Sequence, residues 1–377
     1  MKGHVRKRGS KWVFVVDVGR DEKTGKRIRK WFSGYDTKKA AEKSMAQKIH
    51  ELNTGTYVEP SKETLASFIQ QWLIEKKKNV RNSTYESYEI LSKVHIIPKI
   101  GHYQLNKLNQ VHINKFYDEL SETLSNSTIL KIHKILKMAL NKAVQYGYIA
   151  KNIMGVIDAP RLNKPEMTVW NEEEVRSFLE VAKEERLYIA FLLAVTTGMR
   201  RGEILGLRWK NIDFENYSIS VIQTLSNTGD RFQETKTSNG KRSIALPVEV
   251  IDQLRRHKLM IAKEKLKAGP VYQDNDLIVC TSIGTKMLPS NLRRTWNRLL
   301  EKCNVPKIRF HDLRHTHATL LLKQGVHPKI VQERLGHANI KVTLDTYSHV
   351  LPGLQEEAAK RFGESLFKTK NKNIDSL

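Results

Sequence analysis

Cysteines are scarce: only Cys280 and Cys303 occur among 377 residues. Two isolated thiols argue against a disulfide framework and favour a reducing compartment, so we expect a cytoplasmic protein. Long apolar runs are also missing, because no stretch approaches the ~20 residues that a membrane-spanning helix needs. The basic N-terminus lacks the apolar core of a signal peptide, since "WVFVVDV" is short and is interrupted by Asp17.

Acidic residues are few relative to basic ones. Asp and Glu total 40 against 65 Lys and Arg, which gives a net charge of +25 and a pI near 9.8. Such an excess attracts polyanions. Nucleic acid is therefore the leading expected partner, with binding that weakens steeply as salt rises, and a membrane surface is the second possibility. The length predicts two or three domains, and 40% apolar residues suffice for a core in each.

Residues 1–58 are predicted to form a small β-sheet with one helix. "KWVFVVDV" and "KRIRKWFSG" are strand-like, and "GRDEKTG" between them predicts a hairpin loop closed by Gly25. "DTKKAAEKSMAQKIHEL" follows as a helix with Thr37 as its N-cap. Fifteen Lys and Arg against six Asp and Glu give this segment a net charge of +9. A ribbon of paired strands can enter a DNA major groove, while a solvated surface is the plainer explanation of the charge.

Residues 62–158 are predicted to be all helical, after a linker in "GTYVEPSKE". "TLASFIQQWLIEKK" places its apolar residues on one face, and "STYESYEILSKVHIIP" is predicted as a helix that starts at Ser/Thr caps and stops before Pro98. "QVHINKFYDELSE" and "NSTILKIHKILKMALNKAVQYGYI" follow. The latter sets an apolar stripe against Lys131, Lys134, Lys137 and Lys142. A bundle with a basic side fits a DNA clamp, and an ordinary soluble bundle fits nearly as well.

Residues 165–365 are predicted to be mixed α and β, mainly helical, after a second linker in "DAPRLNKPEM". "VRSFLEVAKEERLYIAFLLAVTTGMRRGEILGL" is predicted to be helical. "YSISVIQT", "FQETKT" and "RSIALP" are predicted strands, the last two joined through "SNGK", whose Asn-Gly favours a tight hairpin turn. Helices resume through "LPGLQEEAAKRF", and residues 366–377 are predicted to be a flexible tail. The expected fold class is therefore multidomain.

Several polar clusters in this third region require a joint explanation. The candidates are Arg200 and Glu203 in "TTGMRRGEILGLRW", Lys236 in "TKTSNGKRSIAL", His311 and Arg314 in "HDLRHTHATLLLKQG", and His337 and Tyr347 in "RLGHANIKVTLDTY". Both pairs at spacing i,i+3 can share a helix face. Taken singly, a surface ion pair or a solvated lysine would explain each of them.

Metal binding is the first joint explanation to weigh. His311, His315 and His317 are close together, and histidines four apart can bind zinc on a helix. However, no Glu lies between His311 and His315 to complete an HExxH motif. Neighbouring arginines would also repel a cation, so no metal and no other cofactor is expected.

A phosphate site accounts for the whole set better. Arginines offer paired donors to phosphate oxygens, and preorganised cations stabilise the charge that develops when phosphorus is attacked. A free tyrosine has a pKa of about 10 and is a poor nucleophile, but nearby cations favour its phenolate. A lysine or histidine can protonate the poor leaving group. We therefore predict that Tyr347 is a covalent nucleophile and that its phenolate is favoured in the site.

On these motifs the chain resembles the tyrosine recombinase (phage integrase) family. The family's order of Arg, Lys, His-x-x-Arg, His or Trp, and Tyr is matched by Arg200, Lys236, His311, Arg314, His337 and Tyr347. Tyr347 lies ten positions after His337, where many members have a spacing of nine. The basic N-terminal segment resembles the arm-type DNA-binding domain of integrases, and the middle region, including "IIPKIGHYQLNKL", resembles their core-binding domain.

The resemblance implies site-specific recombination between two DNA duplexes through a 3′-phosphotyrosyl intermediate, in a tetramer. It assigns transition-state stabilisation to Arg200, Arg314 and His337, and general acid catalysis to Lys236. His311 would position or deprotonate, and Glu203 would hold Arg200. Core and arm attachment sites, an excision factor and a host DNA-bending protein are the implied partners. A chromosome-dimer resolvase, a relaxing topoisomerase and a non-cleaving DNA-binding regulator are the alternatives.

Overall fold

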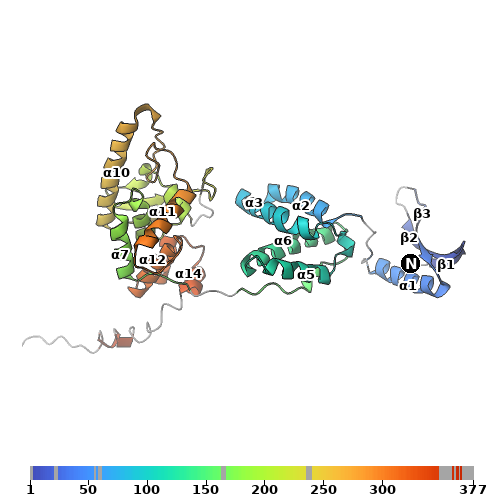
Figure 1. The fold of residues 1–377 in the computed structure, drawn as a ribbon. Coiled ribbons are helices and arrows are strands. Elements are labelled where there is room, and N and C mark those ends of the chain that lie inside the picture. Colours follow the sequence, from blue (N-terminus) through green and yellow to red (C-terminus); the bar gives the residue numbers. More distant parts are fainter. Residues whose placement is uncertain are drawn as a thin grey trace, which may run out of the picture. The chain divides into compact units, whose positions relative to one another are not determined.

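The computed structural model describes residues 3–20, 24–54, 57, 62–162, 167–234, 240–347, 359–360, 362–364 and 366 (Figure 1). The chain divides into two compact units, Met1–Lys164 and Pro165–Leu377. The first contains a small sheet with one helix and then an all-helical part, and the second combines helices with short strands. This confirms the predicted multidomain fold class. Within the described ranges, no helix is long and apolar enough to cross a membrane.

The N-terminal part is a three-stranded antiparallel sheet with a helix packed on it. Its elements are β1 (Gly3–Arg8), β2 (Lys11–Arg20), β3 (Arg27–Tyr35) and α1 (Lys38–Asn53). Both predicted strands are confirmed, whereas the sequence analysis did not identify β1. The Thr37 hydroxyl caps α1 by accepting from the Ala40 amide at 3.2 Å, as predicted. Gly25 has a φ of +66°, which suits the predicted loop, although residues 21–23 lie outside the described ranges.

The sheet presents different chemistry on its two faces. On the inner face Phe14 stacks on Phe32 with ring centroids 4.8 Å apart, and α1 covers them through Ala41. Side chains alternate between faces along a strand, so Trp31 lies on the outer face, where the Arg6 guanidinium sits 4.3 Å from its ring. Trp31 is half exposed, at 50%. The outer face is thus basic and aromatic.

The middle region is all helical, as predicted. Its helices are α2 (Leu65–Asn79), α3 (Asn82–Leu91), α4 (Ile97–Ile100), α5 (Gln110–Ser121) and α6 (Asn126–Gln145). The predicted apolar face of α2 is buried, and the lysines of the α6 stripe lie on its solvent side. α3 starts at Asn82 without a side-chain cap, so the predicted Ser/Thr caps are wrong.

Pro98 does not end this helical run, contrary to the prediction. A π-helical turn, Ser92–Ile96, precedes α4, and the Ile97 amide bonds to the Ser92 carbonyl. Proline has no N–H and normally disrupts the ladder of i→i−4 hydrogen bonds. The wider turn lets the backbone continue, and Pro98 lies in the first turn of α4, where a missing donor costs little.

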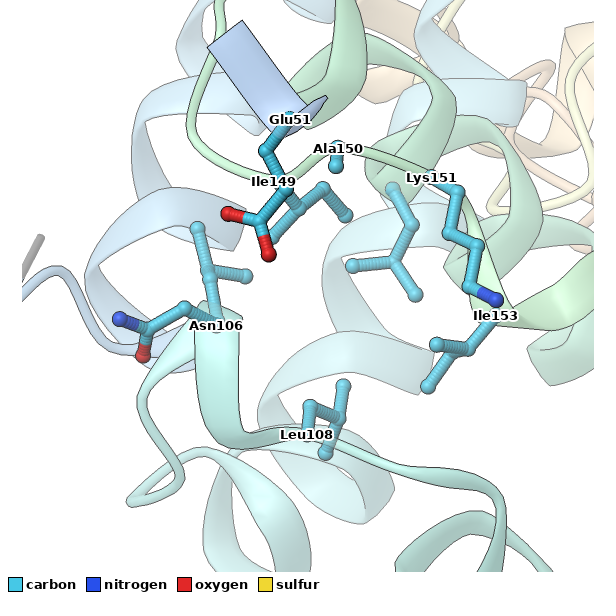
Figure 2. A pocket seen from close by; sticks show the side chains of 9 residues that line it. Glu51, Asn106, Leu108, Ile149, Ala150, Lys151 and Ile153 are labelled. Carbon is cyan, nitrogen blue, oxygen red and sulfur yellow. The ribbon is translucent and has the colours of Figure 1, made fainter. Parts of the chain in front are cut away.

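A hollow of about 350 Å³ lies in the first unit (Figure 2). Its walls are largely aliphatic, with Leu105, Leu108, Leu140, Ile149 and Ile153 among the lining residues. Three polar side chains, Glu51, Asn106 and Lys151, complete the lining. The residues that the sequence analysis selected all belong to the second unit.

The second unit is built around a nearly fully buried helix, α8 (Tyr188–Thr197). Aromatic rings pack beside it, with Phe191 5.8 Å from Trp296 and 5.6 Å from Phe178. The other helices are α7 (Glu172–Ala182), α9 (Arg201–Leu205), α10 (Val248–Ala268), α11 (Pro289–Lys302), α12 (Asp312–Lys323), α13 (Pro328–Leu335) and α14 (Ile340–Tyr347).

The strands of this unit pair differently from the prediction. They are β4 (Ile212–Asp213), β5 (Ser218–Val221), β6 (Gln223–Leu225), β7 (Phe232–Glu234) and β8 (Arg242–Ala245). β8 pairs with β5 and β7 pairs with β6, so the predicted hairpin of the last two strands is wrong within the described residues. The register explains this, because Ile244 opposite Ile219 buries both side chains in the core. Most of "LPGLQEEAAKRF" and nearly all of the predicted tail lie outside the described residues.

Candidate active site

Three arginines converge on the C-terminal end of α13. Each donates to one of three consecutive backbone carbonyls: Arg242 Nε to Arg334 at 2.6 Å, Arg314 Nη2 to Leu335 at 2.7 Å, and Arg200 Nη2 to Gly336 at 3.4 Å. The last carbonyls of a helix lack helical partners and carry partial negative charge, which favours cations there. Gly336 ends α13 in the left-handed conformation, with φ +67°. The end of one helix therefore gathers cations from distant parts of the chain.

Arg314 is the most buried of these cations, at 3% exposure. Its second guanidinium donor, Nη1, bonds to the Gly198 carbonyl at 2.7 Å, so its partners among the described residues are backbone carbonyls. Burial and the neighbouring Arg200 lower the pKa of Arg314 to about 9, which still leaves it charged at pH 7. A buried cation without a carboxylate bonded to it is costly. A bound anion would relieve that cost.

Arg200 is held by Glu203, and Glu203 also holds a second arginine. Arg200 lies just before α9, where its amide donates to Glu203 Oε2 at 2.8 Å and its Nη1 to Oε1 at 2.9 Å. Arg242 Nη2 donates to Oε2 at 2.9 Å. Burial alone would raise the pKa of the Glu203 carboxyl, but Arg242 and Arg200 outweigh it and lower that pKa. Glu203 is only 3% exposed, so the alternative of a surface ion pair is wrong.

Tyr347 is the last residue of α14 and is 1% exposed. Its ring packs in an apolar cluster with Leu322, Val331 and Leu335. The hydroxyl lies 2.8 Å from His315 Nδ1. Burial raises the pKa of Tyr347 to about 12, although Arg314 acts in the opposite direction. The prediction that cations favour the phenolate is therefore wrong for this state, because desolvation of the charged form dominates.

The two histidines of the predicted set, His337 and His311, make different contacts. His337 follows α13, and its Nδ1 lies 2.9 Å from the Thr343 hydroxyl on α14. Burial and Arg314 lower the pKa of His337 to about 4. His311 is exposed at the start of α12, with its ring 5.3 Å from that of His315. His337 therefore contacts α14 through Thr343, whereas the Tyr347 hydroxyl at the end of the same helix lies against His315.

Lys236 lies outside the described residues. The remaining candidates, from Arg200 to Tyr347, all lie in the second unit, and their catalytic roles stay predictions. Over the described ranges, no group of three or more His, Cys, Asp or Glu is placed to hold a metal ion. His317, weighed above as a zinc ligand, is buried with its Nδ1 on the Val195 carbonyl at 2.8 Å. His317 therefore contacts the backbone of α8, whereas His315 contacts the Tyr347 hydroxyl.

Sequence reasoning missed two residues of this site. Arg242 stands in "GKRSIALP" among other basic residues, and no local signal distinguishes it from a solvated arginine. His315 was weighed only as a metal ligand, although its position directly after Arg314 was a usable signal. With both included, the arrangement is a set of fixed cations beside a buried phenol. It can hold a phosphate and offer an oxygen nucleophile to it.

Comparison with known proteins yields matches along the whole chain. Three family profiles match: an Arm DNA-binding domain over residues 4–52, the N-terminal SAM-like domain of phage integrases over 64–121, and the phage integrase family over 168–353. "Tyrosine recombinase XerC-like" of Caldanaerobacter subterraneus subsp. tengcongensis is 34% identical, over 95% of this chain and 97% of that protein. The ICEBs1 integrase of Bacillus subtilis is 27% identical, over 94% and 97%.

Solved structures give a consistent result. The Tn1549 transposon integrase in complex with transposon right end DNA has a TM-score of 0.67 and 25% identity, over 80% of this chain and 99% of that chain. A lambda integrase dimer bound to a COC′ core site has a TM-score of 0.61 and 19% identity, over 91% and 93%. At 19% identity, the similarity to lambda integrase shows a shared fold.

Proposed function

Because this chain belongs to the phage integrase family of tyrosine recombinases, we propose that it integrates and excises a mobile element or prophage at specific DNA sites. It is an enzyme that cuts and rejoins DNA. The observation that carries the proposal is the buried Arg314, bonded to backbone carbonyls beside Arg200 and Tyr347. A scissile phosphate is an anion that this arrangement of cations would bind.

In the proposed cleavage step the Tyr347 oxygen attacks phosphorus. A bond forms from that oxygen to the 3′-phosphate, and the bond from phosphorus to the 5′-oxygen breaks. Arg200, Arg314 and His337 stabilise the charge that develops on the phosphoryl oxygens. Lys236 protonates the leaving 5′-oxygen, His311 positions or deprotonates, and Glu203 fixes Arg200.

Rejoining is the reverse reaction with a new partner strand. The 5′-hydroxyl of that strand attacks the 3′-phosphotyrosyl bond, which conserves the energy of the original linkage. The reaction therefore needs neither ATP nor a metal ion, since the protein supplies the positive charge. Two rounds of strand exchange would pass through a Holliday junction in a homotetramer. An excision factor and a host DNA-bending protein complete the proposed partners, in the cytoplasm of a bacterial host.

The proposed division of labour follows the parts of the chain. Residues 1–58 bind arm-type DNA, residues 62–158 bind core-type DNA, residues 165–365 carry catalysis and residues 366–377 form a tail. The match of residues 4–52 to an Arm DNA-binding domain supports the first assignment. It also favours an integrase over a chromosome-dimer resolvase, because a second DNA-binding module is what bridging two kinds of site requires.

A covalent-adduct assay tests the proposal. Suicide DNA carrying the element's own attachment site is incubated with the protein and resolved on a denaturing gel. Wild type should form a protein–DNA adduct, and Tyr347→Phe should bind the same DNA without forming one, because the ring remains and the nucleophile is lost. A regulator that never cuts gives no adduct with either protein. An adduct with Tyr347→Phe would show that another residue attacks.

A further inference from the structure

His315 is the group in contact with the proposed nucleophile, and no role has been assigned to it so far. Its Nδ1 lies 2.8 Å from the Tyr347 oxygen, within the range of a normal hydrogen bond. The two rings are 5.7 Å apart between centroids. The contact joins α12 to α14 through two residues that are 32 positions apart in the chain, so tertiary folding creates it.

The phenol needs a base, because its surroundings keep it protonated. With a pKa raised to about 12 by burial, roughly one phenol in 10⁵ is ionised at pH 7. The arginines nearby do not reverse this, since desolvation outweighs the effect of Arg314. An attacking oxygen must therefore lose its proton to a neighbouring group as the bond to phosphorus forms.

His315 meets the requirements for that group. Burial, together with His311 and Arg314, lowers the pKa of His315 to about 4, which leaves its imidazole neutral at pH 7. With its proton on Nε2, the ring presents the Nδ1 lone pair to the phenol. His311, by contrast, is exposed and its ring contacts the ring of His315 instead of the phenol hydroxyl, so we keep only the positioning role for His311.

We infer that His315 is the general base that takes the Tyr347 proton when the phenol attacks the scissile phosphate. The inference rests on the proposed strand-cleavage chemistry of Tyr347. The proton passes from the Tyr347 oxygen to His315 Nδ1 while the oxygen–phosphorus bond forms. The bond to the 5′-oxygen breaks, and that oxygen takes its proton from Lys236. In rejoining, the imidazolium returns the proton to the departing phenol.

The charge of the DNA makes this transfer feasible. In the free protein burial is the main reason that a charged imidazole is disfavoured at position 315, and His311 and Arg314 add electrostatic repulsion. A bound phosphate adds negative charge beside the same arginine and offsets that repulsion. The gap between the two free-protein pKa values is wide, so the proton moves together with the attack and not before it.

Two substitutions separate a base from a group that only positions the tyrosine. His315→Asn keeps an acceptor oxygen near the place of Nδ1 but cannot take a proton, and His315→Ala leaves space for added imidazole. His327→Asn, at an exposed histidine before α13, is the matched control. Binding to attachment-site DNA and circular dichroism confirm that each variant is folded.

Single-turnover adduct formation on suicide DNA is the measurement. Both His315 variants should react about 10²–10⁴-fold more slowly than wild type, His327→Asn should match wild type, and imidazole should restore the rate of His315→Ala. His315→Asn within about threefold of wild type would overturn the inference, because general-base catalysis contributes far more than that. Failure of imidazole to accelerate His315→Ala would overturn it as well.

A substrate with sulfur in place of the 5′-bridging oxygen shows whether a residue acts on the leaving group or on the Tyr347 proton. Sulfur leaves without an acid, so Lys236→Ala should recover on it, whereas His315→Asn should stay slow. Recovery of His315→Asn on sulfur would place His315 at the leaving group and contradict its role as base. Absence of an adduct from wild type is a different result, and it would refute the proposed function itself.

Discussion

Glu203 shows how one buried carboxylate organises cations. It is 3% exposed and bonds to Arg242, whose side chain is 6% exposed, and to the more exposed Arg200. Removing one partner of a buried ion pair leaves an uncompensated charge, which costs roughly 3–5 kcal/mol. Glu203 therefore contributes to both catalysis and stability, because the same carboxylate fixes Arg200 and neutralises Arg242.

We expect Glu203→Gln to lower stability by roughly 3 kcal/mol or more and to slow cleavage. The pKa of Glu203 is lowered in the folded state, so its stabilisation is fully present above the unfolded pKa of about 4.3. It is lost as the pH falls through the lower folded value. The gap in melting temperature between wild type and Glu203→Gln should therefore be wide at pH 7 and shrink in acid.

Asp252→Asn is the control for this prediction. Asp252 pairs with Arg255 at 2.9 Å on the surface, where both side chains are about half exposed. An exposed pair of this kind contributes about 0–1 kcal/mol, so the variant should melt close to wild type at every pH. A Glu203→Gln variant as stable as Asp252→Asn at pH 7 would contradict the buried-pair account.

At the scale of elements, the site depends on how helices end. Gly198 terminates α8 in the left-handed conformation, with φ +64°, and its carbonyl accepts from Arg314. A Cβ added there would lie 2.6 Å from Leu335 and 2.7 Å from His317. The end of α8 and the end of α13 are thus held together around Arg314, and their close approach requires a glycine.

We expect Gly198→Ala to destabilise the protein and to reduce cleavage. Gly147 is the control, because it has a φ of +74° and nothing lies within 4 Å of an added Cβ. A substitution there changes stability only through the backbone conformation. Gly147→Ala should cost about 1 kcal/mol for the left-handed conformation alone. Gly198→Ala should cost more, because Leu335 and His317 must also move. Thermal denaturation of both variants measures the difference, and equal losses would mean that the packing around Arg314 can relax.

At the scale of the whole molecule, the basic N-terminal module and the catalytic candidates lie in different parts of the chain. Residues 1–58 carry a net charge of +9, and the outer face of their sheet joins Arg6 to the half-exposed Trp31. The catalytic candidates all come from the second unit. A basic sheet face suits DNA binding through phosphate contacts and groove insertion.

We expect a chain that starts at Ser61 to cleave core-type sites and resolve junctions but to fail in integration, because it cannot bridge arm and core sequences. The isolated N-terminal module should bind one attachment-site duplex, with affinity that falls as salt rises. Footprinting the full and shortened chains on the same attachment DNA checks this. Identical protected regions would rule out a separate arm-binding role.

Local sequence was sufficient to predict much of this protein. The spacing of apolar residues predicted α2 and α6, the Thr37 cap predicted the start of α1, and motif order selected candidate site residues that all lie in the second unit. These features depend on near neighbours in the chain: periodicity within a helix, a cap within one turn, or chemistry carried by residue type. Such information is present before the chain folds.

Only the tertiary structure decided the rest. In the folded chain β8 pairs with β5, and the helical run continues past Pro98 after a π-helical turn. Arg242 also bonds to Glu203, which the sequence did not indicate. The tertiary structure also reversed the expected state of the nucleophile, whose pKa burial raises to about 12 in contact with His315. Strand partners, desolvation and hydrogen bonds between distant helices depend on which surfaces meet, and residue spacing along the chain does not specify that.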